Sequence, residues 1–292
     1  MTRLFERSAR SKRRCAMIRN NLAMAAMLLL VLPAATKSDE PTASPDEAGH
    51  ARRASAMQRS AAQFTIRLRD ESERPLKLVT KPIQRWANPE NAAKDGTIYL
   101  WTDRGRPAVA LGLFTYDDDH FSHEWQSLTA SSLTASHAAG TEWTTSEPGI
   151  SFEKLEKVDP PAAAPAARLR QMKALAGRFT ATYVGFSENQ NPLELRLLPQ
   201  PLYRYESSEI PELVDGGIFA FVQGTDPQLL LIVEAWKAAS GEHWQFACAR
   251  SASGAVAAKY EGREVFSVPK YDFQHDPRKP FLLLPRQPAP EE

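Results

Sequence analysis

The feature that most constrains the fold is an ordered series of matching segments in the two halves of the chain. Phe64 matches Phe179 at a separation of 115 positions, and Pro107 matches Pro227 at a separation of 120. Other matches fall between and after these in the same order: 82–86 with 201–205, 95–101 with 215–221, and His123 with His243. An ordered series of this kind predicts an internal duplication, with each half folding as a similar unit.

Each unit is expected to begin with a helix. Apolar side chains recur at steps of three, four and three residues in both halves, which places them on one face of a helix. They are Ala54, Met57, Ala61 and Phe64 in the first half, and Leu169, Met172, Ala176 and Phe179 in the second.

Strand-like runs follow each helix, separated by short Pro-rich or Gly-rich breaks. Such breaks suit antiparallel hairpins rather than parallel crossovers. In the second unit the runs are Leu193–Leu198, Ile218–Val222, Leu229–Trp236 and His243–Ala249. The predicted fold class is therefore α+β: two tandem copies of a helix followed by an antiparallel sheet of about four strands. This arrangement resembles cystatin-like domains, a likeness of architecture that implies no function.

Two details follow from the predicted duplication. Asp95-Gly96 and Asp215-Gly216 are both expected to be turns entering a strand, because glycine supplies backbone freedom there. The two repeat units are expected to pack on each other about a pseudo-two-fold axis, as in a homodimer.

The N-terminus has the pattern of a secretory signal peptide, which we assign to residues 1–35. Residues 1–20 hold seven basic residues and one acidic residue, and an apolar run of 11 residues and a small-residue zone follow. A membrane span needs about 20 residues. We therefore expect export to the periplasm, cell envelope or exterior, with no stable membrane span after cleavage; an uncleaved anchor is the weaker alternative.

Composition divides the remaining chain. Polar and Pro-rich stretches predict a flexible tether, a linker and a flexible tail. The boundaries are 36–50 for the tether, 51–144 for the first unit, 145–167 for the linker, 168–284 for the second unit and 285–292 for the tail.

Charge and cysteine content exclude some functions. Without residues 1–35 the chain has 29 basic and 34 acidic residues, so nothing draws it electrostatically to nucleic acid. Only Cys248 remains after cleavage, so no intramolecular disulfide can form. Because Cys248 lies in an apolar run, we expect a buried, unreactive thiol.

Segments 197–205, 215–216 and 219–227 also resemble a group of uncharacterised exported proteins of planctomycete-type bacteria. The likeness covers most of residues 55–265. This group has no known activity, so the resemblance implies neither a function nor site residues.

Two repeated pairs are the first candidates for ligand contact: Arg85-Trp86 and Arg204-Tyr205. An arginine beside an aromatic ring can stack on a ligand or clamp an anion. The alternative, which we favour, is that each arginine covers its own sheet or forms an ion pair with Asp95 or Asp215.

His123 and His243 are the second candidates, because they recur at matching positions and each precedes a tryptophan closely. A half-buried structural role is favoured over a general base, since no serine or cysteine partner is evident from spacing. The stretch 117–124 (DDDHFSHE) offers metal-ligand types, but a solvated loop is favoured there. We expect no metal and no cofactor.

Familiar catalytic signatures are missing from the sequence, including phosphate-binding glycine loops and nucleophile elbows. Whether the protein is an enzyme stays open. The leading hypothesis is an exported, non-catalytic binding or envelope-associated protein. The alternative is an exported hydrolase of unfamiliar type, with a site inside or between the two units.

Overall fold

The computed structural model describes residues 45–69, 74–88, 93–117, 119–138, 140–186 and 191–290. The predicted signal peptide, residues 1–35, lies outside them, as does the predicted tether up to residue 44. All helices and strands of the described residues belong to one compact unit, Ala43–Glu292. Neither helix of the described residues has the length and hydropathy that a membrane span requires.

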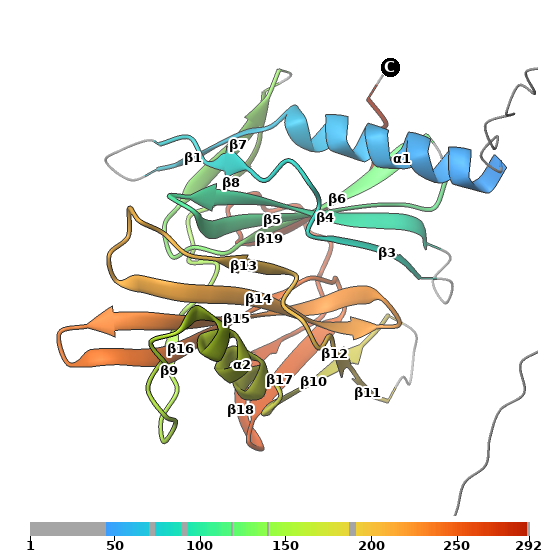
Figure 1. Cartoon of the computed structure of the whole chain (residues 1–292). Helices are drawn as coiled ribbons and strands as arrows, with labels where there is room; N and C mark the ends of the chain where they lie inside the picture. The colour runs from blue at the N-terminus through green and yellow to red at the C-terminus, as the bar shows by residue number, and fades with distance from the viewer. Residues whose placement is uncertain are drawn as a thin grey trace, which may run out of the picture. The chain divides into compact units, whose positions relative to one another are not determined.

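Two helices and nineteen strands make up the described chain. Figure 1 shows how they are arranged. The helices are α1 (Pro45–Ala62) and α2 (Pro165–Ala176). The strands of the first half are β1 (Thr65–Leu68), β2 (Lys77–Leu78), β3 (Gln84–Asn88), β4 (Ala93–Asp103), β5 (Arg106–Thr115), β6 (His120–Ser127), β7 (Leu133–His137), β8 (Gly140–Thr144) and β9 (Glu153–Lys154). Those of the second half are β10 (Phe179–Val184), β11 (Leu193–Glu194), β12 (Arg196–Leu197), β13 (Tyr203–Tyr205), β14 (Leu213–Gln223), β15 (Asp226–Ala238), β16 (Gly241–Arg250), β17 (Ala255–Tyr260), β18 (Arg263–Val268) and β19 (Phe281–Pro288).

These strands form four sheets, and every named strand pair is antiparallel. One six-stranded sheet has the order β19-β6-β5-β4-β2, with β3 also paired to β4. The other has the order β12-β14-β15-β16-β9, with β13 also paired to β14. The two smaller sheets are β1-β7-β8 and β11-β10-β17-β18.

The predicted α+β fold class is wrong. Strands account for 52% of the chain and helices for 12%, so the protein is mostly β, with several antiparallel sheets instead of two helix-plus-sheet copies. The cystatin-like expectation falls with it. Strands from distant parts of the chain complete the large sheets: β19 pairs with β6, and β9 pairs with β16.

Both six-stranded sheets are buried on two faces, which explains their nearly continuous apolar strands. Along β4, Ile98 and Leu100 belong to one apolar cluster, whereas Tyr99 and Trp101 belong to another. Successive side chains point to opposite faces of a strand, so each strand contributes side chains to the apolar clusters on both faces of its sheet. The cluster containing Ile98 also takes in side chains of β14, β15 and β16, and so joins the two large sheets face to face.

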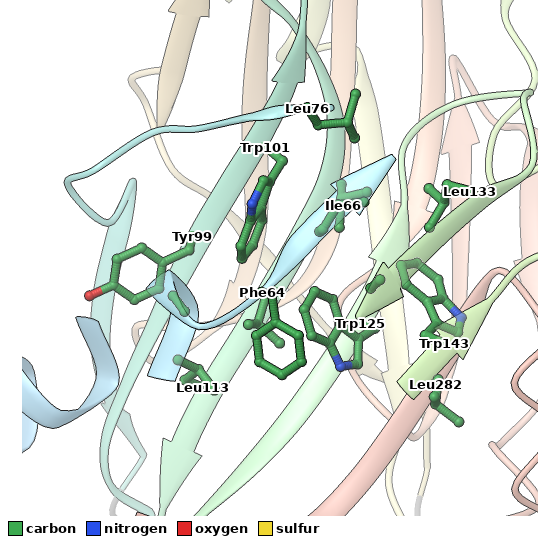
Figure 2. Packing of buried hydrophobic residues seen from close by; sticks show 14 of the residues in the cluster. Phe64, Ile66, Leu76, Tyr99, Trp101, Leu113, Trp125, Leu133, Trp143 and Leu282 are labelled. Atoms are coloured by element: carbon green, nitrogen blue, oxygen red, sulfur yellow. The ribbon is translucent and has the colours of Figure 1, made fainter. Parts of the chain in front are cut away.

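The outer face of the first large sheet is covered by α1 and the β1-β7-β8 sheet. Phe64, just after α1, packs edge-on against Trp125 with ring centroids 4.8 Å apart, and Trp125 stacks on Trp143 at 5.6 Å. Figure 2 shows these rings together with Ile66 and Leu133 of the small sheet. The second large sheet is covered similarly by α2 and the β10-β17 strands, through Met172, Phe179 and Tyr260.

Three segments assigned from composition contain regular structure. Helix α1 begins at Pro45, within the segment assigned to the tether. Strand β9 lies within the linker 145–167, and β19 extends into the tail 285–292 as far as Pro288. Cys248 is buried as expected, and burial raises the pKa of its thiol to about 12.

Candidate functional site

The first predicted pair, Arg85-Trp86, lies on β3, where Arg85 is bound to a carboxylate of its own chain. Arg85 Nε donates to Asp95 Oδ1 at 2.9 Å, and Arg53 Nε donates to Asp95 Oδ2 at 3.3 Å. Burial opposes the charge of Asp95. Hydrogen bonds from Arg85, His50 and Arg53 outweigh it and hold the pKa of Asp95 below its ordinary value.

The second predicted pair, Arg204-Tyr205, lies on β13 and makes the corresponding contacts. Arg204 donates to both oxygens of Asp215, at 3.0 and 2.6 Å, and Arg168 Nε donates to Asp215 Oδ2 at 2.9 Å. The structure thus shows the ion-pair alternative at both arginines. A common origin of the two halves stays a prediction.

The predicted turns at Asp95-Gly96 and Asp215-Gly216 are wrong, because both dipeptides lie inside long strands, β4 and β14. Each glycine instead makes room for an aromatic ring. A Cβ on Gly96 would lie 2.3 Å from Trp86 Cε2, and a Cβ on Gly216 would lie 2.5 Å from the ring of Tyr205. The glycines are therefore needed for close packing rather than for backbone freedom.

His123 is the centre of a buried hydrogen-bond chain. Its Nε2 lies 3.2 Å from Ser60 Oγ, and its Nδ1 lies 3.2 Å from Glu142 Oε1. A serine, a histidine and a carboxylate in this order resemble a catalytic triad. However, Ser60 is 3% exposed and sits in the last turn of α1, so a substrate carbonyl has no access to its hydroxyl.

Glu142 extends this hydrogen-bond chain, because its carboxylate contacts two further side chains. Trp125 Nε1 donates to Glu142 Oε1 at 3.0 Å, and His137 Nε2 lies 3.2 Å from Glu142 Oε2. Burial works against its charge, but the bonds from His123 and Trp125 prevail and lower the pKa of Glu142. The geometry is that of a satisfied polar network within an aromatic core.

The remaining sequence candidates are not drawn into a shared site. His243 lies on β16 opposite Trp236, and its ring has no hydrogen bond within the described residues. His120 Nδ1 lies 3.3 Å from Asp117 Oδ1 at the start of β6. No cluster of three or more metal-ligating side chains occurs in the part of the chain that the structure describes.

A different site lies between the two halves, and we call it the carboxyl cavity. It has a volume of about 70 Å³ and is bordered by Glu124 of β6 and Asp226 of β15. Four aromatic side chains form much of its wall: Trp86, Phe114, Tyr116 and Tyr183. The rest of the lining is Ile98, Gly112, Pro227, Gln228 and the segment 251–253. Trp86 is thus the predicted site residue that does border a cavity.

Glu124 is the most unusual group in the carboxyl cavity. Its Oε1 atom is fully buried and has no hydrogen-bond partner among the described residues. Burial, reinforced by the nearby charge of Asp226 and partly offset by Arg250, raises the pKa of Glu124 to about 8.

Asp226 is better satisfied but also resists ionisation. Its Oδ2 accepts a hydrogen bond from Asn88 Nδ2 at 2.9 Å. Burial nevertheless raises the pKa of Asp226 to about 7, against the lowering effect of Asn88 and Gln228. At neutral pH the cavity therefore holds at least one proton on its carboxyl groups.

Arg250 is a positive charge that acts on Glu124, but its donors point to backbone carbonyls. It donates to the carbonyls of Ala252 and Gly254, both at 2.8 Å, and of Pro269 at 3.3 Å. Burial lowers the pKa of Arg250. The guanidinium acts on Glu124 as a nearby charge and leaves Oε1 without a partner.

The carboxyl pair was not predicted from the sequence. Glu124 closes the acidic stretch 117–124, and Asp226 lies in a break between two strand-like runs, so each looked like a solvated loop residue. One local feature could have indicated that Glu124 is buried: it lies between Phe121 and Trp125, in a run with the spacing of a strand. Nothing local connects it to Asp226, because only the packing of the two large sheets brings them together.

Comparisons of the chain with family models, with curated proteins and with solved structures found no match.

Proposed function

We propose that this protein is an exported, non-catalytic binding protein and that the carboxyl cavity is its ligand site. The observation that carries the proposal is the buried, unpartnered Oε1 of Glu124 at the edge of a cavity. Leaving a buried acceptor without a hydrogen bond costs roughly 1–3 kcal/mol. A ligand that supplies the missing partner removes this cost and explains why a carboxyl group occupies the position.

The size of the cavity supports binding over catalysis. Its volume of about 70 Å³ is far below the roughly 300–1,000 Å³ of pockets that enclose drug-sized molecules. It admits a compact molecule or one end of a longer molecule, and leaves no room for a sugar between two catalytic carboxyls.

Among the described residues, the arrangement that best fits the hydrolase alternative is the hydrogen-bond chain of Ser60, His123 and Glu142. These contacts are in the order that a catalytic triad requires, but the hydroxyl of Ser60, which would be the nucleophile, is buried beneath α1. We therefore assign these residues a structural role.

Thermal unfolding of the full chain with a panel of compact cations, anions and neutral molecules tests the binding proposal. We expect at least one to raise the Tm of the wild type but not of Ser251→Leu, in which a larger side chain fills the cavity wall. Arg263→Gln, on the surface strand β18, is the matched control. The proposal fails if no compound raises the Tm, or if Ser251→Leu responds like the wild type.

Export needs its own test, since it rests on the pattern of residues 1–35. A fusion of residues 1–45 to a reporter that is active only outside the cytoplasm is expected to give signal. A silent reporter, with the full chain retained in the cytoplasm, would contradict it.

A further inference from the structure

We infer that the ligand of the carboxyl cavity is a monovalent organic ammonium group, with Glu124 and Asp226 as counter-ions and aromatic rings as walls. The inference rests on the proposed function, because it names the class of ligand for the same cavity.

The charge balance of the cavity favours a single positive charge. The cavity holds two carboxyl groups, and Arg250 is the positive charge that acts on Glu124, so full ionisation leaves one negative charge without a partner. The other titratable side chains on the wall are the phenols of Tyr116 and Tyr183. Burial raises both of their pKa values, that of Tyr183 to about 12, so both phenols are neutral at pH 7. A monovalent cation that replaces one carboxyl proton lets both carboxyl groups ionise while the cavity stays neutral, in a place where an uncompensated charge is expensive.

The aromatic side chains that line the cavity favour an organic cation over a calcium ion. Trp86 and Phe114 have ring centroids 5.8 Å apart, and Phe114 meets Tyr116 edge-on at 5.8 Å. Aromatic faces attract ammonium groups by cation–π interaction, worth roughly 2 kcal/mol or more when desolvated. Calcium instead needs about six to eight oxygen ligands, and the described residues provide no cluster of three acidic or other metal-ligating side chains.

The volume limits the size of the head group. About 70 Å³ is a small space. An ammonium or methylammonium group fits this space. The tail of a longer amine has to leave the cavity, and Tyr116, which is 45% exposed, shows that the wall reaches the surface.

Binding of the cation is expected to displace protons. Burial favours the protonated forms of the two carboxyl groups, whereas a nearby ammonium group favours their ionised forms. Affinity therefore rises with pH, by up to about tenfold per pH unit for each proton displaced.

The experiment is equilibrium dialysis of the full protein against radiolabelled methylammonium at pH 6 and pH 8. We expect one site per chain, with binding stronger at pH 8 by about tenfold or more. Glu124→Gln keeps the shape but cannot become negative, and we expect it to weaken binding by about tenfold or more. Asp226→Asn is the second variant, in case the first does not fold, and Arg263→Gln is the control. Circular dichroism checks the fold of each.

The outcomes separate this inference from the proposed function. If acetate, methanol or calcium ions, but not methylammonium, raise the Tm of the wild type and not that of Ser251→Leu, the ammonium inference is wrong and the binding proposal stands. If methylammonium binds equally to wild type and to the carboxyl variants, the assigned counter-ions are wrong. If no probe of any class binds, both proposals fail.

Discussion

The guanidinium of Arg106 on β5 makes a bidentate interaction with the carboxylate of Glu234 on β15, with N–O distances of 2.8 and 2.7 Å. Glu234 is fully buried, and Tyr205 Oη and Gln245 Nε2 donate to the same carboxylate at 2.8 and 2.9 Å. This bonded set links the two large sheets. It also explains why Tyr205, a candidate for ligand contact, is engaged within the fold.

Removing one member of this buried ion pair is expected to be costly. Glu234→Ala leaves the charge of Arg106 without its partner, so we expect the free energy of unfolding to fall by about 3–5 kcal/mol. The matched control is Glu153→Ala, which breaks an exposed contact with Arg263 of 3.3 Å and should cost less than about 1 kcal/mol. Urea unfolding followed by circular dichroism measures both. Equal losses would contradict a structural role for the buried pair.

The second prediction concerns Gly96, which lies beneath the ring of Trp86. Gly96→Ala places a methyl group 2.3 Å from Trp86 Cε2, so the ring has to move, and we expect a loss of about 1–3 kcal/mol in the free energy of unfolding. Gly177→Ala is the control, because its new Cβ would meet its nearest neighbours at an ordinary 3.5 Å.

A double-mutant cycle tests the cause. If the ring of Trp86 is responsible, Gly96→Ala is expected to cost much less in a Trp86→Leu background, with a coupling of about 1 kcal/mol or more. An equal cost in both backgrounds would assign the effect to the backbone instead.

The parts of the fold that were predicted correctly depend on local patterns. Met57 and Met172 are buried on α1 and α2, as their helical spacing indicated. Phe64 and Phe179 are buried too, but their predicted place on the helices is wrong: Phe64 follows the end of α1, and Phe179 begins strand β10. The breaks at 103–107 and 223–227 do join antiparallel neighbours, β4 with β5 and β14 with β15. Periodicity and turn residues act over a few positions, so one sequence is sufficient to read them.

The fold class was wrong because long-range pairing decides it. Leu282 pairs with Trp125, and Phe246 pairs with Glu153, yet neither partner is marked by a local signal. Short strands such as Thr65–Leu68 also alternate between exposed and buried positions and lack a continuous apolar run. The carboxyl pair was missed for the same reason, since Glu124 and Asp226 meet only when the two large sheets pack.

The buried hydrogen-bond chain of Ser60, His123 and Glu142 provides a third prediction, which tests the hydrolase alternative. We expect no labelling of the folded protein by a serine-directed fluorophosphonate, because Ser60 is 3% exposed. Ser60→Ala is expected to cost about 1 kcal/mol in the free energy of unfolding through the lost hydrogen bond to His123. Stoichiometric labelling of the wild type, absent in Ser60→Ala, would instead establish an accessible nucleophile.

The last prediction concerns pH, and two sets of carboxyl groups act in opposite directions. Asp95 and Glu142 have lowered pKa values, so their contribution to stability is present above their unfolded pKa values and is lost as the pH falls through the folded ones. Glu124 and Asp226 have raised pKa values, of about 8 and about 7. Their contribution is complete below the unfolded values, near 4, and is lost as the pH rises.

We therefore expect the free energy of unfolding of the ligand-free protein to decrease between pH 5 and pH 8. Each raised carboxyl group contributes a slope of at most about 1.4 kcal/mol per pH unit, since its folded form binds the extra proton. Glu124→Gln and Asp226→Asn should each flatten this decrease, and the double variant should nearly abolish it. Asp276→Asn is the control, because Asp276 has its pKa lowered to about 2 by Arg278 and does not titrate in this range. Urea unfolding at each pH gives the curves. A wild-type stability that is constant or rising from pH 5 to pH 8 would contradict the assignment of protonated carboxyls to the cavity.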